Sequence, residues 1–235
     1  MKRSEPMKHS EPVRIEFRQD TTRFGTKARA HVKTTHVKTG LIVIDIQNDY
    51  FSGGSYPLVG SEAAALVGSG VLEAARSAAL PVIHVQHRAD GEDATFFRPG
   101  TVGAEIHPLL TPRDDERVLV KTTPNSFIDT GLNDILRADG ITDLVVIGMM
   151  SSMCVDATVR AALDLGFAVT VVHDACAAPD LEFDGTWLPG HLVHAAFMAA
   201  LGDAGARVMP AAELAPTPGD TAAAGRPSDV KPEPT

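Results

Sequence analysis

The chain has few cysteines, no long apolar run and an excess of negative charge. Two of its 235 residues are cysteine, Cys154 and Cys176, which are too few for a disulfide framework and suit a reducing compartment. No apolar stretch reaches the roughly 20 residues needed to cross a bilayer, and the N-terminus lacks a run long enough for a secretory signal. The net charge of −9 argues against a nucleic-acid-binding surface over the whole protein. We therefore expect a soluble, cytoplasmic protein with neither a nucleic-acid nor a membrane partner.

The two ends of the chain differ in composition from its middle. Residues 1–38 carry ten lysines and arginines against four acidic residues and few large apolar ones, so we predict a basic, disordered leader. Residues 213–235 are rich in proline, alanine and glycine without periodicity, which predicts a tail. Residues 39–212 are long enough to bury the core of one domain.

Within that domain, short apolar runs alternate with segments of helical character. We predict strands over 41–46, 81–85, 117–120, 143–147, 167–172 and 206–209. Helices are predicted over 61–79, with Ser61 as its N-cap, and over 130–138, 152–165 and 192–201, with a short helix near 102–106. The strands are almost continuously apolar, which is typical of a parallel sheet covered on both faces. The predicted fold is α/β: a three-layer α/β/α, doubly wound parallel sheet of about six strands.

Three of these strands lead into residues with reactive side chains. Asp45 lies in the first strand, Lys121 directly follows the third, and Cys154 lies a short turn after the fourth. Open α/β sheets bind ligands beyond the carboxyl ends of their strands, so we expect the carboxylate, ammonium and thiol to meet there. No strand end is followed by a GxxxxGK or GxGxxG pattern, so we expect no phosphate-binding loop.

Cys154 is predicted to begin the helix over 152–165, capped by Ser151 or Ser152. The unpaired N–H groups at a helix N-terminus favour a thiolate, so we expect the pKa of this thiol to lie below its usual value. The alternative is that Cys154 is a small buried hydrophobic residue, as most free cysteines are. Cys176 ends the fifth strand and is expected to be buried and inert.

Three segments together resemble the isochorismatase-like cysteine hydrolase superfamily. They are Ile44-Asp45-Ile46-Gln47-Asn48-Asp49, Lys121 followed by Asn125-Ser126-Phe127, and Gly148-Met149-Met150-Ser151-Ser152-Met153-Cys154-Val155. The resemblance extends over residues 39–209. Residues 97–101 and 164–176 are most similar to the streptothricin-hydrolase-like branch of amidohydrolases.

The resemblance implies a catalytic triad and an oxyanion hole. Cys154 would be the nucleophile, Asp45 the proton acceptor and donor, and Lys121 their electrostatic partner. The backbone N–H groups of Met150 and Cys154 would bind the oxyanion, next to a cis peptide bond at Met149–Met150. The resemblance also implies a sheet order of 3-2-1-4-5-6 and a homo-oligomer, either a dimer or a tetramer.

We predict that polar and aromatic residues near the strand ends contact the substrate, namely Gln47, Tyr50, Phe51 and Phe127; Trp187 is expected in the core. No metal or cofactor is expected. His84 and His87 would point to opposite faces of one strand, which is poor ligand geometry, and His107 has no paired ligand. This departs from nicotinamidases, whose metal ligands follow the second strand.

The function that we predict is cysteine-dependent hydrolysis of a C–N bond in a small amide or lactam through an acyl-cysteine, with no cofactor. A nicotinamidase-type hydrolase is the alternative within the same family. Two alternatives come from other classes: a thiol redox protein that uses Cys154 and Cys176, and a non-catalytic binding protein on the same fold.

Overall fold

The computed structural model describes residues 37–89, 91 and 93–214. The predicted leader up to residue 36 and the predicted tail from residue 215 lie outside these residues. No helix in the described ranges combines the length and the apolar character needed to span a bilayer.

The domain is built on a six-stranded sheet in the order β3-β2-β1-β4-β5-β8, with every neighbouring pair parallel. This confirms the predicted fold class and strand order. The strands are β1 (Thr39–Ile44), β2 (Val82–His87), β3 (Arg117–Lys121), β4 (Asp143–Met149), β5 (Ala168–Ala177) and β8 (Arg207–Met209).

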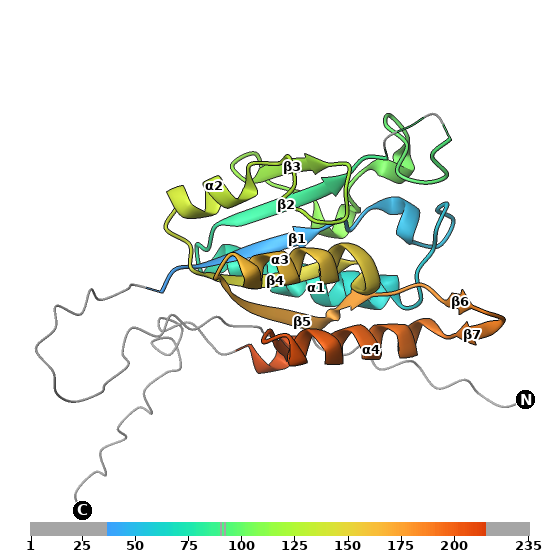
Figure 1. Cartoon of the computed structure of the whole chain (residues 1–235). Helices are drawn as coiled ribbons and strands as arrows, with labels where there is room; N and C mark the ends of the chain where they lie inside the picture. Colours follow the sequence, from blue (N-terminus) through green and yellow to red (C-terminus); the bar gives the residue numbers. More distant parts are fainter. Residues whose placement is uncertain (1–36, 90, 92, 215–235) are drawn as a thin grey trace, which may run out of the picture.

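Helices cover both faces of the sheet (Figure 1). In β1, Leu41 and Val43 pack in the core beneath α1 (Ser61–Ser77), whereas Ile42 and Ile44 pack in the core on the opposite face. That second core receives side chains from α2 (Leu132–Ala138), α3 (Asp156–Asp164) and α4 (Gly190–Asp203). Alternation of apolar side chains toward two covered faces explains why the strands are continuously apolar in sequence.

The β1 and β4 backbones approach each other closely at the reactive edge of the sheet. Gly148 pairs with Ile44, and a Cβ at this glycine would lie 2.3 Å from the Ile44 carbonyl oxygen. Only glycine therefore fits, and its φ of 148° also disfavours any other residue. This approach places the turn that follows β4 directly beside Asp45, the residue that follows β1.

The helix predicted over 152–165 begins later than expected. A π-helical turn, Ser151–Val155, comes first, and α3 starts at Asp156. The predicted serine cap is wrong, because Ser151 is fully buried and its Oγ donates to the Ala177 carbonyl oxygen and bonds His194 Nδ1. A buried hydroxyl needs hydrogen-bond partners, and those of Ser151 come from β5 and α4 rather than from its own helix.

The predicted cap at Ser61 is also wrong by one residue. Gly60 precedes α1 with a left-handed φ of 77°, and Ser61 is the first residue of the helix. The Ser61 hydroxyl donates to the Leu58 carbonyl oxygen instead of capping. A residue with positive φ at this position favours glycine, so the chain enters the helix without a side-chain cap.

The segment after the fifth strand differs most from the prediction. β5 continues to Ala177, with an irregularity that shifts its register against β4 between Val146 and Gly148. A short hairpin then follows, β6 (Leu181–Phe183) and β7 (Thr186–Leu188), which projects from the domain in Figure 1. Trp187 lies on this hairpin and is 61% exposed, so its predicted place in the core is wrong. Three-residue strands are too short to give an alternating pattern in sequence.

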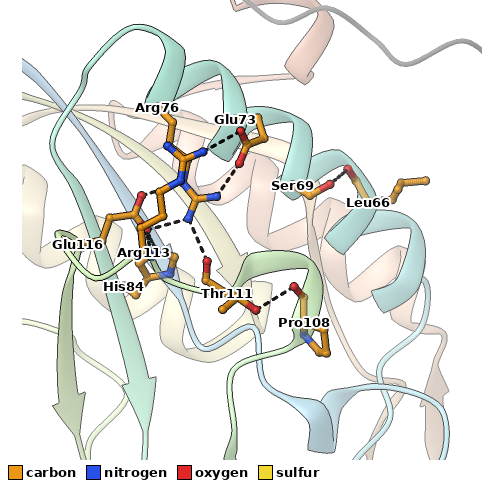
Figure 2. Close-up of polar contacts among 9 residues, drawn as sticks. All are labelled: Leu66, Ser69, Glu73, Arg76, His84, Pro108, Thr111, Arg113 and Glu116. Carbon is orange, nitrogen blue, oxygen red and sulfur yellow. Dashed lines mark hydrogen bonds and ion pairs between the residues drawn. The ribbon is translucent and has the colours of Figure 1, made fainter.

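A buried ionic network connects α1 to β2 and the start of β3, as Figure 2 shows. The Glu116 carboxylate accepts hydrogen bonds from Arg76 Nε and Nη2 at 2.7 and 2.8 Å, and from the Arg113 N–H at 2.9 Å. His84 Nε2 lies 2.9 Å from the same carboxylate. Burial raises the pKa of Glu116, but these hydrogen bonds outweigh it and lower the pKa to about 2.

Glu116→Gln is expected to lower the free energy of unfolding by about 2–3 kcal/mol at pH 7, because the pKa of this carboxyl lies well below its usual value near 4.5. A lowered pKa stabilises the folded state fully above about pH 4.5, and the stabilisation is lost as the pH falls toward 2. The difference between wild type and variant should therefore shrink between pH 7 and pH 3, as measured by urea unfolding.

Glu73→Gln is the matched control, since the Glu73 carboxylate pairs with Arg76 and Arg113 but its side chain is 58% exposed. Exposed ion pairs contribute at most about 1 kcal/mol. Equal losses in both variants, or a Glu116→Gln effect that does not depend on pH, would contradict the proposed role of the buried carboxylate.

Candidate active site

The carboxyl ends of four adjacent strands supply the site. Asp45 directly follows β1, His87 ends β2, Lys121 ends β3, and Cys154 lies in the turn after β4. The sheet order places these four strands side by side. Asp45, Lys121 and Cys154 are buried, with exposed fractions of 0%, 2% and 3%.

Lys121 brings the predicted residues together. Its Nζ lies 2.6 Å from Asp45 Oδ2 and donates a hydrogen bond to Cys154 Sγ at 3.3 Å. Its third contact is His87 Nδ1 at 3.0 Å. The carboxylate, ammonium and thiol that the sequence placed on separate strands thus converge on one buried position.

Asp45 adopts a left-handed backbone conformation with a φ of 48°. A non-glycine residue is disfavoured there, and such conformations concentrate at functional sites. The Asp45 N–H bonds the Val85 carbonyl oxygen at 3.0 Å, so the backbone is held to β2 while the carboxylate turns toward Lys121.

The pKa of Cys154 is raised, opposite to the direction expected from the sequence. Burial is the largest cause, the negative charge of Asp45 adds to it, and the Lys121 ammonium opposes both. The expectation considered only the helix N-terminus, but the thiol lies inside a π-helical turn and beside a carboxylate. The resting site therefore holds a neutral thiol next to the Asp45–Lys121 ion pair.

Burial also raises the pKa of Asp45, with Lys121 opposing the rise. A carboxylate with a raised pKa is a stronger base than one in water, and this one lies beside a thiol that must lose its proton to become a nucleophile. The geometry therefore allows proton transfer from Cys154 to Asp45 within one buried cluster.

The turn that carries Cys154 has the backbone features that the resemblance implied. The Met149–Met150 peptide bond is cis. The Met150 carbonyl oxygen accepts from the N–H groups of Met153 and Val155 at 3.1 and 3.2 Å, on either side of Cys154. The Cys154 N–H is not one of its donors, which suits its predicted place in an oxyanion hole.

The predicted substrate contacts lie in several environments. The Gln47 side-chain amide bonds the backbone of His87 and the carbonyl oxygen of Ala104. Tyr50 is buried against Phe97, with ring centroids 4.6 Å apart.

Phe51 stacks on His107 at 3.9 Å, and Phe127 packs on Phe167 at 6.1 Å. His107 Nδ1 also accepts a hydrogen bond from the Leu109 N–H. These contacts are within the protein, so substrate contact by Gln47, Tyr50, Phe51 and Phe127 stays a prediction.

The two histidines of β2 contact different partners: His84 contacts Glu116, and His87 contacts Lys121. Sequence reasoning did not assign His87 to the site. Its position could have indicated a role in the site, because His87 ends β2, and β2 lies between the strands that lead to Asp45 and Lys121.

Asp45, His87 and Cys154 offer metal-ligand atoms that lie within 4.8 Å of one another. The Lys121 ammonium contacts all three of these residues. The ammonium is thus the cation that these side chains surround. The absence of a catalytic metal stays a prediction.

The second cysteine lies apart from this cluster. Cys176 is buried, and its Sγ donates to the Val172 carbonyl oxygen at 3.4 Å. Burial raises its pKa to about 12, so the group is a protonated thiol at neutral pH. Both cysteines are free.

Comparison with known proteins agrees with this geometry. The family model described as the isochorismatase domain matches residues 39–213. The uncharacterized isochorismatase family protein YddQ of Bacillus subtilis is 49% identical over 163 residues, which cover 69% of this chain and 91% of that protein. A streptothricin hydrolase of Streptomyces noursei is 41% identical over 143 residues, covering 60% of this chain and 50% of the hydrolase.

Among solved structures, an isochorismatase-family protein from Oleispira antarctica superposes with a TM-score of 0.73 at 47% identity, covering 81% of this chain and 98% of that one. The resemblance inferred from three short segments is confirmed. The chain belongs to the isochorismatase family of hydrolases.

Proposed function

We propose that the chain is a cysteine-dependent amidohydrolase that cleaves a C–N bond of a small amide or lactam through an acyl-cysteine. The observation that carries the proposal is the contact of one buried ammonium, that of Lys121, with both the Asp45 carboxylate and the Cys154 thiol. Family membership sets the class of hydrolase. The relatives include ureidoacrylate amidohydrolases of Caulobacter at 33% identity, and the streptothricin hydrolase described above.

The first half-reaction forms the acyl-enzyme. As Sγ of Cys154 attacks the amide carbon, its proton passes to the Asp45 carboxylate. The carbonyl oxygen becomes an oxyanion, which the N–H groups of Met150 and Cys154 would bind. The C–N bond then breaks, and the proton held by Asp45 moves to the leaving nitrogen. A thioester and a free amine or ammonia result.

The second half-reaction restores the enzyme. Asp45 accepts a proton from water as the water oxygen attacks the thioester carbon, and the proton returns to sulfur as the C–S bond breaks. The charge of Lys121 stabilises the anionic forms of sulfur and carboxylate throughout, and the low dielectric of the buried site strengthens this effect. The proton that leaves Cys154 thus departs on the released nitrogen, and the attacking water supplies the one that restores the thiol.

The assembly and location of the protein are also proposals. We propose a homo-oligomer, either a dimer or a tetramer, in the cytoplasm. Apolar side chains of the β6–β7 hairpin support an interface, since Phe183 and Trp187 are 77% and 61% exposed.

Screening small amides, lactams, carbamoyl amines and nicotinamide for release of ammonia or amine tests the proposed reaction. At least one class is expected to turn over, and acid quenching should trap the enzyme with the mass of the acyl group on Cys154. Turnover of nicotinamide alone would favour the nicotinamidase alternative. Release of amine with no acyl adduct on rapid quench, or no turnover of any class, would count against the proposal.

A further inference from the structure

His87 contacts the catalytic cluster from the strand that lies in its middle. β2 separates β1, which leads to Asp45, from β3, which ends with Lys121. His87 is in register with Lys121 across the β2–β3 pair. Strand order and register therefore bring a side chain at this position to the Lys121 ammonium.

The Lys121 ammonium has three N–H groups and three acceptors around it. Asp45 Oδ2, His87 Nδ1 and Cys154 Sγ lie 2.6, 3.0 and 3.3 Å from Nζ. The Lys121 side chain is fully buried, so water cannot replace a lost partner without opening the site. A buried N–H without an acceptor is costly, so loss of His87 Nδ1 would leave the ammonium short of a partner.

The contact fixes the protonation state of the histidine. An ammonium only donates hydrogen bonds, so Nδ1 must accept and carries no proton. The ring is then neutral with its hydrogen on Nε2, which has no hydrogen-bond partner among the described residues. Burial and the positive charge of Lys121 lower the pKa of His87 to about 4, in agreement with a neutral ring at pH 7.

The Gln47 side chain fixes the backbone of His87. Its Nε2 donates to the His87 carbonyl oxygen and its Oε1 accepts from the His87 N–H, both at 2.8 Å. The ring itself lies 5.9 Å from that of Phe97. Because its backbone is hydrogen-bonded to Gln47 and its ring packs near Phe97, His87 can hold the flexible Lys121 side chain in one orientation.

We propose that His87 is a positioning residue that orients the Lys121 ammonium between Asp45 and Cys154. Its neutral Nδ1 and Cys154 Sγ each accept a hydrogen bond from the ammonium, which at the same time forms an ion pair with Asp45 Oδ2. This role adds a residue to the proposed hydrolytic mechanism and rests on that proposal. The unpartnered Nε2–H remains free to donate to a substrate atom.

Two substitutions separate positioning from packing. His87→Asn keeps an acceptor, the side-chain oxygen, near the place of Nδ1, whereas His87→Leu fills similar space without one. His87→Leu is expected to lower kcat about 10²-fold with little change in KM, since misplacement by about 1 Å can cost this much. His87→Asn should keep kcat within about fivefold of wild type. Equal losses in both variants, or none in either, would overturn the proposal.

A measurement without substrate makes the test independent of the proposed reaction. The ¹⁵N NMR signals of labelled His87 in the wild-type protein are expected to report a neutral ring at pH 7 with its proton on Nε2. A charged ring, or a proton on Nδ1, would overturn the proposal even if both variants behaved as expected. If the tautomer is as expected but no amide turns over, the proposed function fails while the Lys121–His87 contact stands.

Discussion

Cys154→Ala is expected to lower kcat/KM by about 10⁴-fold or more. The substitution removes the atom that forms the acyl-enzyme, and loss of a nucleophile is among the largest effects of single substitutions in hydrolases. Amine or ammonia release from the substrate found in the amide screen measures the effect. Thermal unfolding should change little, because alanine occupies the same buried position with one atom fewer.

Cys176→Ala is the matched control. This cysteine is also buried in the core, but its sulfur bonds a backbone carbonyl oxygen and lies outside the cluster around Lys121. Its substitution is expected to change kcat/KM by less than about threefold. Loss of function in both variants would favour the thiol redox alternative, in which the two cysteines form a reversible disulfide. Full amine release by Cys154→Ala would instead mean that Cys154 is not the nucleophile.

Asp45→Asn is expected to abolish hydrolysis and at the same time make Cys154 more reactive toward iodoacetamide. Loss of the proton acceptor should lower kcat by about 10²–10⁴-fold, the usual contribution of a general base. The negative charge of Asp45 is one cause of the raised pKa of Cys154, and Lys121 opposes the rise. Removing that charge leaves the ammonium unopposed, so the thiolate fraction at a given pH rises about tenfold per unit of pKa.

The rate of alkylation against pH, followed by intact mass with Cys176 also replaced by alanine, measures this second effect. The pH at which labelling reaches half its maximal rate is expected to fall in Asp45→Asn. Asp156→Asn is the control, because this carboxylate is two residues from Cys154 but pairs with Arg160 on the α3 surface. Its labelling curve should match that of wild type. Slower labelling of Asp45→Asn would mean that Asp45 already holds the thiol proton in the resting protein.

The strand ends were predictable from sequence because their signals are local. An apolar run followed by Asp45 or Lys121 identifies both a buried strand and the edge at which it ends, and parallel pairing then brings these residues together. Three short segments together indicated the family, and the eight residues Gly148–Val155 around Cys154 are the most specific of them. The strand order came with the family and could not be obtained from periodicity, since each run has the same pattern.

The predictions from sequence were wrong or incomplete where contacts distant in the chain, rather than neighbouring residues, determine the environment of a side chain. The direction of the Cys154 pKa shift depends on burial and on a carboxylate 109 positions earlier in the chain, which the helix-terminus argument ignores. His87 looked like an ordinary strand residue until the order of strands placed it between Asp45 and Lys121. Trp187 was assigned to the core by residue type, but it lies on a hairpin whose strands are too short to be recognised.

The neutral state of the Cys154 sulfur affects how the protein withstands oxidants. Peroxide attacks thiolates much faster than thiols, and attack leads through sulfenic acid to irreversibly oxidised forms. If the chain hydrolyses amides as we propose, its sulfur is open to this damage mainly while it is deprotonated for attack. The burial and the Asp45 carboxylate that raise the pKa of Cys154 therefore predict slow oxidation of the resting protein by peroxide.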